Sequence, residues 1–95
     1  MKKKVEIFTT PSCHYCHLAK DFLAKHKTDT FEVIEYDVTK DVLRRKELID
    51  LGAMGVPLIR LSGNSKTLIL NGFGPDEEDQ ISEYLGLGKY KTGMI

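Results

Sequence analysis

Cys13 and Cys16 are the only two cysteines in this 95-residue chain, and two residues separate them. A short apolar run at residues 5–8 and a turn containing Pro11 precede the pair, and apolar residues at helical spacing follow it. At such a junction the first cysteine lies where the free N–H groups and the positive end of a helix dipole stabilise a thiolate. The second cysteine lies about one helical turn further on, near enough to form a disulfide with the first. The spacing therefore predicts a pair that exchanges two electrons.

The composition is that of a single globular domain. Apolar residues make up 41% of the chain and charged residues 29%, and chains of roughly 55–65 residues already fold alone. The net charge of zero argues against a nucleic-acid-binding or membrane-surface protein. The apolar stretch behind Lys2–Lys4 is too short for a signal peptide, and the sequence contains no membrane-spanning run. We therefore expect a cytoplasmic protein, in which a cysteine pair is more often catalytic or metal-binding than structural.

The apolar spacing predicts the element order β-α-β-α-β-β-α. Strands are expected at residues 3–8, 31–36, 58–61 and 67–70, and helices at residues 13–26, 39–51 and 75–85. A right-handed crossover makes the first two strands parallel, and a hairpin turn at residues 62–66 makes the last two antiparallel. The predicted fold class is α/β, a four-stranded mixed sheet flanked by three helices. The cysteine pair then lies at the carboxyl end of the first strand.

Each helix is expected to bury one apolar stripe. The stripes consist of Tyr15, Leu18, Ala19, Phe22 and Leu23, then Val42, Leu43, Leu48, Ile49 and Leu51, then Ile81, Tyr84 and Leu85. Thr39 is the predicted N-cap of the second helix and Gly52 its left-handed end, whereas the basic run Arg44–Lys46 is predicted to be a solvated face. Residues 1–86 are predicted to form the domain, and residues 87–95, which show no pattern, a mobile tail.

The chain carries three separated motifs, which are residues 9–16 (TTPSCHYC), Gly55-Val56-Pro57 and Gly72-Phe73. In this order and spacing they resemble the glutaredoxin family over residues 3–86. The resemblance implies a thioredoxin-like fold and a dithiol thiol–disulfide oxidoreductase that reduces protein or glutathione mixed disulfides. It also implies that Cys13 attacks, that Cys16 resolves, and that the Val56–Pro57 bond is cis and faces the disulfide.

The same resemblance implies a substrate-binding groove beside the cysteines. Its residues are Thr10, Tyr15, Val56, Pro57, Gly72 and Phe73. The backbone around Val56 would pair with an extended segment of the substrate. His14 replaces the proline that usually stands between the cysteines, and a charged His14 would stabilise the thiolate of Cys13, although an exposed loop histidine explains it equally well. No metal and no tightly bound organic cofactor is implied.

The implied electron donor depends on the subtype. Thr10 stands where glutathione-using members commonly carry a lysine, and Asn71-Gly72 replaces their usual Gly-Gly. Residues 72–76 (GFGPD) are more similar to the NrdH-type redoxins, which take electrons from thioredoxin reductase, although Leu70 stands where those often carry a tryptophan. The expected partners are disulfide-bearing proteins together with either glutathione or thioredoxin reductase and NADPH. An alternative role is that of an NrdH-type electron donor to ribonucleotide reductase.

Other functions would use the same residues. Residues 13–17 also match the C-x-x-C-H pattern of c-type haem attachment, although such proteins are exported and mostly helical. Zinc is possible because the cysteines, His14 and His17 are ligand types, but a structural site usually places a second ligand pair elsewhere, and His26 is the only further histidine. An iron–sulfur cluster shared between two subunits and a redox-inactive binding module are both disfavoured by the intact pair. We therefore predict a monomeric redox protein.

Overall fold

The structure is a computed structural model that describes residues 2–26, 29–63 and 66–87. Its elements are β1 (Lys3–Thr9), α1 (His14–Lys25), β2 (Phe31–Asp37), α2 (Val42–Asp50), β3 (Leu58–Ser62), β4 (Leu68–Asn71) and α3 (Pro75–Leu85). The predicted element order is confirmed. Residues 88–95 of the expected tail and residues 64–65 of the expected hairpin turn lie outside the described residues, whereas Leu87 packs against the core. Within the described part of the chain, no helix is long and apolar enough to cross a membrane.

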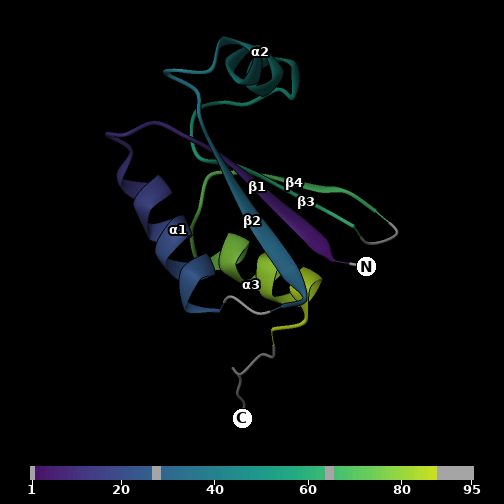
Figure 1. Ribbon diagram of the computed structural model, residues 1–95. Coiled ribbons are helices and arrows are strands. Elements are labelled where there is room, and N and C mark those ends of the chain that lie inside the picture. The colour runs from purple at the N-terminus through teal and green to yellow at the C-terminus, as the bar shows by residue number, and fades with distance from the viewer. Residues whose placement is uncertain (1, 27–28, 64–65, 88–95) are drawn as a thin grey trace.

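The four strands form one mixed sheet in the order β2-β1-β3-β4 (Figure 1). β1 pairs parallel with β2, and β3 pairs antiparallel with both β1 and β4. The parallel pair is possible because α1 carries the chain back across the sheet. In the β1–β3 pair Phe8 lies opposite Leu58, so the end of β1 meets the start of β3. The loop that follows β1 and the loop that precedes β3 therefore share one end of the sheet.

The main core lies between one face of the sheet and the helices α1 and α3 (Figure 1). Alternate strand residues supply the sheet side, and one stripe of each helix supplies the other side. The fully buried members are Val5, Ile7, Ala19, Leu23, Phe31, Ile59, Leu61 and Ile81. Each such aliphatic or aromatic side chain contributes roughly 1.5–3 kcal/mol by leaving water, so this cluster fixes α1 firmly against β1.

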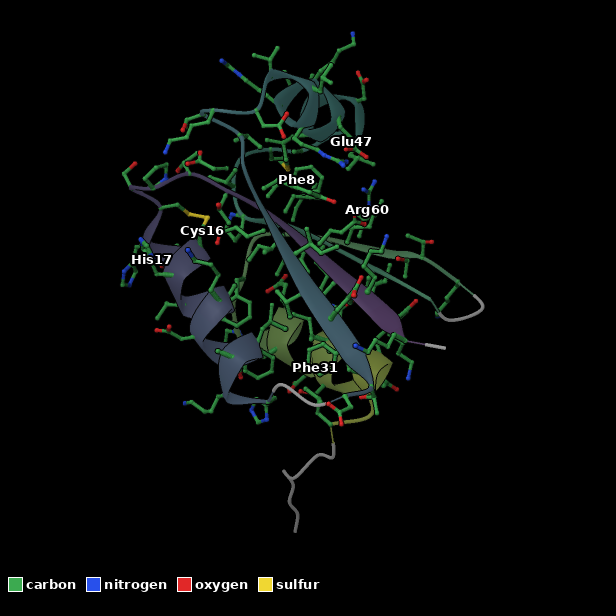
Figure 2. The ribbon with its side chains drawn as sticks, in the orientation of Figure 1. Phe8, Cys16, His17, Phe31, Glu47 and Arg60 are labelled. Atoms are coloured by element: carbon green, nitrogen blue, oxygen red, sulfur yellow. A yellow bond between two sulfur atoms is a disulfide. The ribbon has the colours of Figure 1, made fainter. Side chains whose placement is uncertain are left out.

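Helix α2 packs against the opposite face of the sheet through a second, smaller cluster. The buried residues of this cluster are Phe8, Val38, Leu48 and Leu58. Next to it the contact between α2 and the sheet is ionic, because Nη1 of Arg60 lies 2.8 Å from Oε2 of Glu47 (Figure 2). Arg60 comes from β3 and Glu47 from α2, so the two elements are joined by charge as well as by apolar contact.

The predicted N-cap of α2 is wrong. Asp41 caps the helix, since its Oδ1 accepts a hydrogen bond from the backbone N–H of Arg44 at 3.1 Å. Thr39 is instead part of a turn in which Oδ1 of Asp37 accepts bonds from both the backbone N–H and the hydroxyl of Thr39, at 2.9 and 2.5 Å. Aspartate side chains favour such turns, and this one delays the start of the helix.

The predicted inward stripe of α2 is partly wrong as well. Val42, Leu43 and Ile49 are 78%, 78% and 66% exposed, while Leu48 is buried and Leu51 half-buried. The predicted solvated face is also partly wrong, because Nη1 of Arg44 lies 2.7 Å from Oε1 of Glu47. The physical reason is the sheet beneath α2. The guanidinium of Arg60 bonds to Glu47 as well as to Glu6 of β1, and this contact turns Glu47 towards the sheet and leaves Val42, Leu43 and Ile49 outside.

Candidate active site

Cys13 and Cys16 lie at the N-terminus of α1 and are joined by a disulfide, with a Cα–Cα distance of 5.2 Å. Cys13 is the N-cap residue, and its Sγ accepts a hydrogen bond from the backbone N–H of Cys16 at 3.1 Å. A side-chain acceptor at this position satisfies one of the free N–H groups of the first turn and lies at the positive end of the helix dipole. Both effects stabilise a thiolate at Cys13.

The two cysteines differ in their access to solvent. Cys16 is 0% exposed, whereas Cys13 is half-buried. Cys16 faces inward as a member of the apolar stripe of α1. This orientation places Tyr15 and Leu18, which were predicted to be in that stripe, on its flank with 57% and 40% exposure. Of the two sulfur-bearing residues, Cys13 is therefore the one open to solvent.

Two contacts order the loop in front of the cysteines. The backbone N–H of Cys13 donates to the carbonyl oxygen of Thr10 at 3.2 Å. Nε2 of His17 lies 3.1 Å from the carbonyl oxygen of Pro11, with the His17 side chain on the outer side of α1 (Figure 2). His14 is exposed, and its ring packs against the ring of Tyr15 with a centroid distance of 5.5 Å. Among the described residues, no hydrogen bond joins His14 to Cys13.

The Val56–Pro57 peptide bond is cis, as predicted. Pro57 is buried directly before β3, and its carbonyl oxygen accepts a hydrogen bond from the backbone N–H of Gly72 at 2.8 Å. Gly72 has φ +94°, a left-handed conformation that favours glycine because it has no Cβ. The proline loop and the Gly72 loop are thus bonded to each other.

The pairing of the strands brings these loops to the cysteine end of the sheet. Leu58 follows Pro57 and pairs with Phe8, and the loop that ends at Cys13 begins shortly after Phe8. The three motifs of the sequence therefore gather at one end of the sheet. Phe73 has a different environment, because its ring packs against Phe22 of α1 with a centroid distance of 5.7 Å.

A hollow of about 230 Å³ lies beside the proline loop. It is lined by Met54, Gly55, Val56, Asn71 and Gly72. Oδ1 of Asn71 accepts a hydrogen bond from the backbone N–H of Met54 at 3.2 Å, which ties this loop to the end of β4. Neither Asn71 nor Met54 was predicted as a site residue. The only available signal was the position of Asn71, a polar residue at a strand end directly before Gly72.

One cation on α1 and one on α2 are paired with carboxylates. Lys20, one turn beyond Cys16, has its Nζ 3.0 Å from Oε2 of Glu35, and the hydroxyl of Thr9 donates to the same oxygen at 2.8 Å. Partial burial opposes ionisation of Glu35, but these two bonds prevail and hold its pKa below the usual range. Arg44 is likewise neutralised by Glu47.

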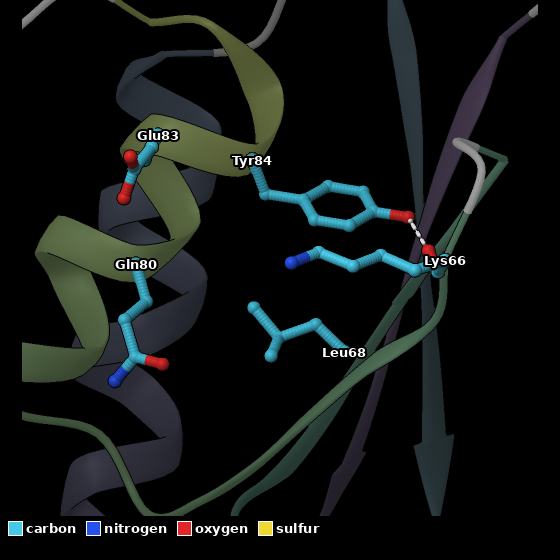
Figure 3. Close-up of a pocket in the computed structure, with 5 residues that line it drawn as sticks. All are labelled: Lys66, Leu68, Gln80, Glu83 and Tyr84. Atoms are coloured by element: carbon cyan, nitrogen blue, oxygen red, sulfur yellow. Dashed lines mark hydrogen bonds between the residues drawn. The ribbon is translucent and has the colours of Figure 1, made fainter.

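Two further observations concern other kinds of site. Within residues 2–26, 29–63 and 66–87, no three or more His, Cys, Asp and Glu side chains converge as a metal would require. A second hollow of about 300 Å³ lies between α3 and β4 (Figure 3). Its lining consists of Lys66, Leu68, Gln80, Glu83 and Tyr84, with the Tyr84 hydroxyl donating to the carbonyl oxygen of Lys66. This hollow contains none of the predicted site residues.

The sheet order, the three helices and the cysteine pair at the start of α1 define a thioredoxin-fold redox protein. Solved structures show the same architecture. The thioredoxin-like protein BC3987 is 27% identical with a TM-score of 0.64, covering 81% of this chain and 97% of that one. NrdH-redoxin from Escherichia coli, a glutaredoxin-like protein with a thioredoxin-like activity profile, has a TM-score of 0.65 at 20% identity, covering 82% and 93%. At that identity the second comparison shows the fold alone.

Sequence comparison gives the family. Residues 5–65 match the glutaredoxin family model. A glutaredoxin-like 8.6 kDa protein encoded in the rubredoxin operon of Clostridium pasteurianum is 31% identical over 80 residues, covering 83% of this chain and 97% of the relative. A probable thioredoxin of Methanothermobacter marburgensis is 33% identical over 63 residues, covering 66% and 74%. The chain belongs to the glutaredoxin family.

Proposed function

We propose that this protein is a dithiol thiol–disulfide oxidoreductase that reduces protein or glutathione mixed disulfides. One observation carries the proposal, namely the unequal environment of the two cysteines. Cys13 is accessible and its Sγ accepts the N–H of Cys16 at 3.1 Å, while Cys16 is fully buried one turn behind it. The first arrangement suits a nucleophile and the second a resolving thiol. The hollow beside Val56 supplies a surface on which a substrate segment can lie.

The reaction needs only the two sulfurs of the protein. The Cys13 thiolate attacks one sulfur of the substrate disulfide, so a Cys13–substrate disulfide forms while the substrate S–S bond breaks. The leaving thiolate takes a proton from water. The thiol of Cys16 then loses its proton and attacks Sγ of Cys13, which forms the intramolecular disulfide and releases the second substrate thiol. The substrate gains two electrons from the cysteine pair and two protons, one from the thiol of Cys16 and one from solvent. A separate thiol or dithiol reductant must then restore the pair.

Serine variants of the cysteines test this assignment. Wild type should reduce the disulfides of insulin catalytically in the presence of a reductant. Cys16→Ser should stop after one turnover as a mixed disulfide at Cys13, which mass spectrometry detects, whereas Cys13→Ser should form no adduct. Ser12→Ala is the matched control, because it changes a neighbouring exposed hydroxyl and leaves both sulfurs in place. Equal adducts from the two cysteine variants would contradict the roles, and an inactive wild type would contradict the function.

A second, finer proposal concerns the electron source, which we infer to be a flavin-dependent thioredoxin reductase with NADPH. The resemblance of residues 72–76 to the NrdH-type redoxins supports it. Glutathione carries two carboxylates and needs cationic or N–H partners beside Cys13, yet Thr10 replaces the usual lysine there and Lys20, one turn beyond Cys16, already binds Glu35. The cations Lys40, Arg45 and Lys46, which form no ion pair among the described residues, lie on or just before α2 rather than in the loop that holds Cys13. Losing one charged contact would weaken glutathione binding by about 1–3 kcal/mol, roughly 5–150-fold.

The two donors are compared by NADPH consumption in coupled assays on one disulfide substrate. We expect faster turnover with thioredoxin reductase than with millimolar glutathione and glutathione reductase. Thr10→Lys should raise the glutathione-dependent rate specifically, because it restores the missing charge, while Thr10→Ser serves as its neutral control. Efficient turnover of wild type with glutathione, and none with the reductase, would place this protein among the glutathione-dependent members of the family.

A further inference from the structure

Helix α2 exposes more apolar side chain than an ordinary surface helix. Its side towards the sheet carries charged Arg44 and Glu47 beside buried Leu48, while three large apolar side chains of the helix face solvent. A helix normally buries its apolar stripe and leaves charge in water. Contiguous apolar surface that remains outside marks an interaction site, whereas single exposed apolar residues are common and need no explanation.

Four exposed apolar residues lie on α2 or in the loop after it; we call this set the α2 apolar face and define it as Val42, Leu43, Ile49 and Met54. Val42 and Ile49 are seven residues apart and so lie on the same side of the helix. Met54, 91% exposed, follows in the loop beyond the helix. The loop begins with a turn at the end of α2, in which the backbone N–H of Gly52 donates to the carbonyl of Ile49 at 3.0 Å.

The α2 apolar face is continuous with the candidate active site through Met54. Met54 lines the hollow beside the proline loop together with Val56 and Gly72. Its backbone N–H is held by the Asn71 side chain, so its position is fixed relative to that hollow. Met54 therefore joins the hollow to the loop that leaves α2.

Positive charge lies within this face, since Arg45 and Lys46 fall between Val42 and Ile49 on the helix surface. Arg45 and Lys46 are exposed on α2 and Lys40 is exposed just before it, and in the described part of the chain none of the three forms an ion pair. Two exposed carboxylates lie among them, Asp41, which accepts the N–H of Arg44 as the helix cap, and Asp50 at the end of α2, so the three cations outnumber the carboxylates. An occupant with carboxylates next to apolar side chains matches this surface in both charge and polarity.

We propose that the α2 apolar face docks an acidic, apolar segment of the protein whose disulfide Cys13 attacks, an inference that rests on the proposed function. A second copy of this chain fits less well, because antiparallel pairing of two α2 helices through Val42 and Ile49 brings Arg45 and Lys46 of both copies together. A lipid surface fits less well, because the face leads into the hollow of the redox site. The substrate class is thus an acidic protein rather than a small disulfide.

The test uses peptide mixed disulfides as probes. Each peptide has one cysteine joined to a thionitrobenzoate chromophore and a tail of about 12 residues, which reaches roughly 40 Å when extended. One tail alternates Leu and Glu, one alternates Leu and Lys, and one contains only Gly and Ser. The reduced protein is mixed with each peptide, and kcat/KM is read from chromophore release. The symmetrical disulfide of two thionitrobenzoate groups, which carries no peptide, serves as the small substrate.

Three variants give the readout. Val42→Ser with Ile49→Ser removes apolar surface at exposed positions, and Lys46→Glu reverses one charge. Ile69→Ser is the matched control, because Ile69 is a 39% exposed apolar residue on the edge strand β4 and outside the face. Thermal unfolding confirms that each variant folds.

We expect wild type to reduce the Leu/Glu peptide at least ~10-fold more efficiently than the Gly/Ser peptide, a gain that falls with added salt. The double serine variant should lose the gain, Lys46→Glu should shift it towards the Leu/Lys peptide, and Ile69→Ser should keep it. All variants should reduce the small disulfide equally.

Equal rates for the three peptides, or an equal loss in Ile69→Ser, would overturn the proposal. So would a dimer, or binding to phosphatidylglycerol vesicles, that the double serine variant abolishes while its peptide rates stay unchanged. Failure of the proposed function is distinguishable from these results, since wild type would then leave even the small disulfide intact.

Discussion

The guanidinium of Arg60 and the carboxylate of Glu6 lie opposite each other across the β1–β3 pair, with Nε 2.7 Å from Oε1 and Nη2 2.9 Å from Oε2. Glu6 is only 6% exposed, and the hydroxyl of Tyr36 also donates to its Oε2 at 2.7 Å. Because Arg60 bonds to Glu47 of α2 as well, the pair connects the middle of the sheet to the helix that leads into the proline loop. The guanidinium of Arg60 therefore bonds both to the buried carboxylate of the sheet and to the helix that precedes the proline loop.

The first prediction is that Glu6→Gln destabilises the fold and removes part of its pH dependence. The bonds from Arg60 hold the pKa of Glu6 below its usual range, although burial acts in the opposite direction. Because the folded pKa lies below the unfolded value of about 4.3, this stabilisation is fully present above the unfolded value and is lost as the pH falls through the folded pKa. The variant should lower the free energy of unfolding near neutral pH by about 3 kcal/mol and flatten its fall in acid, measured by urea unfolding.

Glu35→Gln is the control for that measurement. Glu35 and Lys20 form an ion pair whose side chains are 42% and 33% exposed, so solvent screens their attraction. Its removal should change the free energy of unfolding by less than about 1 kcal/mol. Equal losses in the free energy of unfolding for Glu6→Gln and Glu35→Gln would show that the buried Glu6–Arg60 pair stabilises the fold no more than the exposed Glu35–Lys20 pair does.

The second prediction concerns the start of α2. Asp41→Ala removes the side-chain acceptor for the N–H of Arg44 and should lower the free energy of unfolding by about 1 kcal/mol. Thr39→Ala breaks only the hydroxyl bond to Asp37 on the exposed turn and should have a smaller effect. Thermal unfolding of the two variants ranks them, and the opposite ranking would restore Thr39 as the cap.

Much of the fold was predictable because its signals are local. The spacing of apolar residues located every element, and the Cys13–Cys16 spacing located the start of α1. The inward side of α2 was not predictable from spacing, because it depends on Glu6 and Arg60, which are 54 residues apart in the chain and meet only in the sheet. The apolar rule applied to α2 alone therefore chose the wrong face.

The candidate site also combines features that local motifs predict with features that depend on residues distant in the chain. The positions of Cys13, Val56, Pro57 and Gly72 followed from motifs, and the structure brings these residues to one end of the sheet. The bond from Met54 to Asn71 could not be foreseen, because it joins two loops 17 residues apart through a side chain with no motif of its own.

The third prediction tests that bond. Asn71→Ala should free the loop before Pro57, and exchange of the Met54 amide hydrogen should accelerate by roughly 5-fold, the equivalent of about 1 kcal/mol for one hydrogen bond. Asn71→Asp keeps an acceptor oxygen and should retain protection. Amide exchange followed by NMR measures both. Equal exchange in wild type and Asn71→Ala would show that the side chain does not hold the loop.

The last prediction is that Cys13 has a depressed pKa. In the structure the Sγ of Cys13 occupies the N-cap position, where the N–H of Cys16 and the α1 dipole favour an anion once the disulfide is reduced. We expect a pKa between about 3.5 and 7.5, the range of thiols at helix N-termini and in C-x-x-C pairs. Alkylation rate against pH measures it best in Cys16→Ser, which leaves one thiol and preserves the backbone donor. The same variant unfolded in urea is the control and should titrate near 8.5, the ordinary cysteine value. If the folded and unfolded curves coincide, the helix terminus does not activate Cys13, and the chemistry proposed for it loses its physical basis.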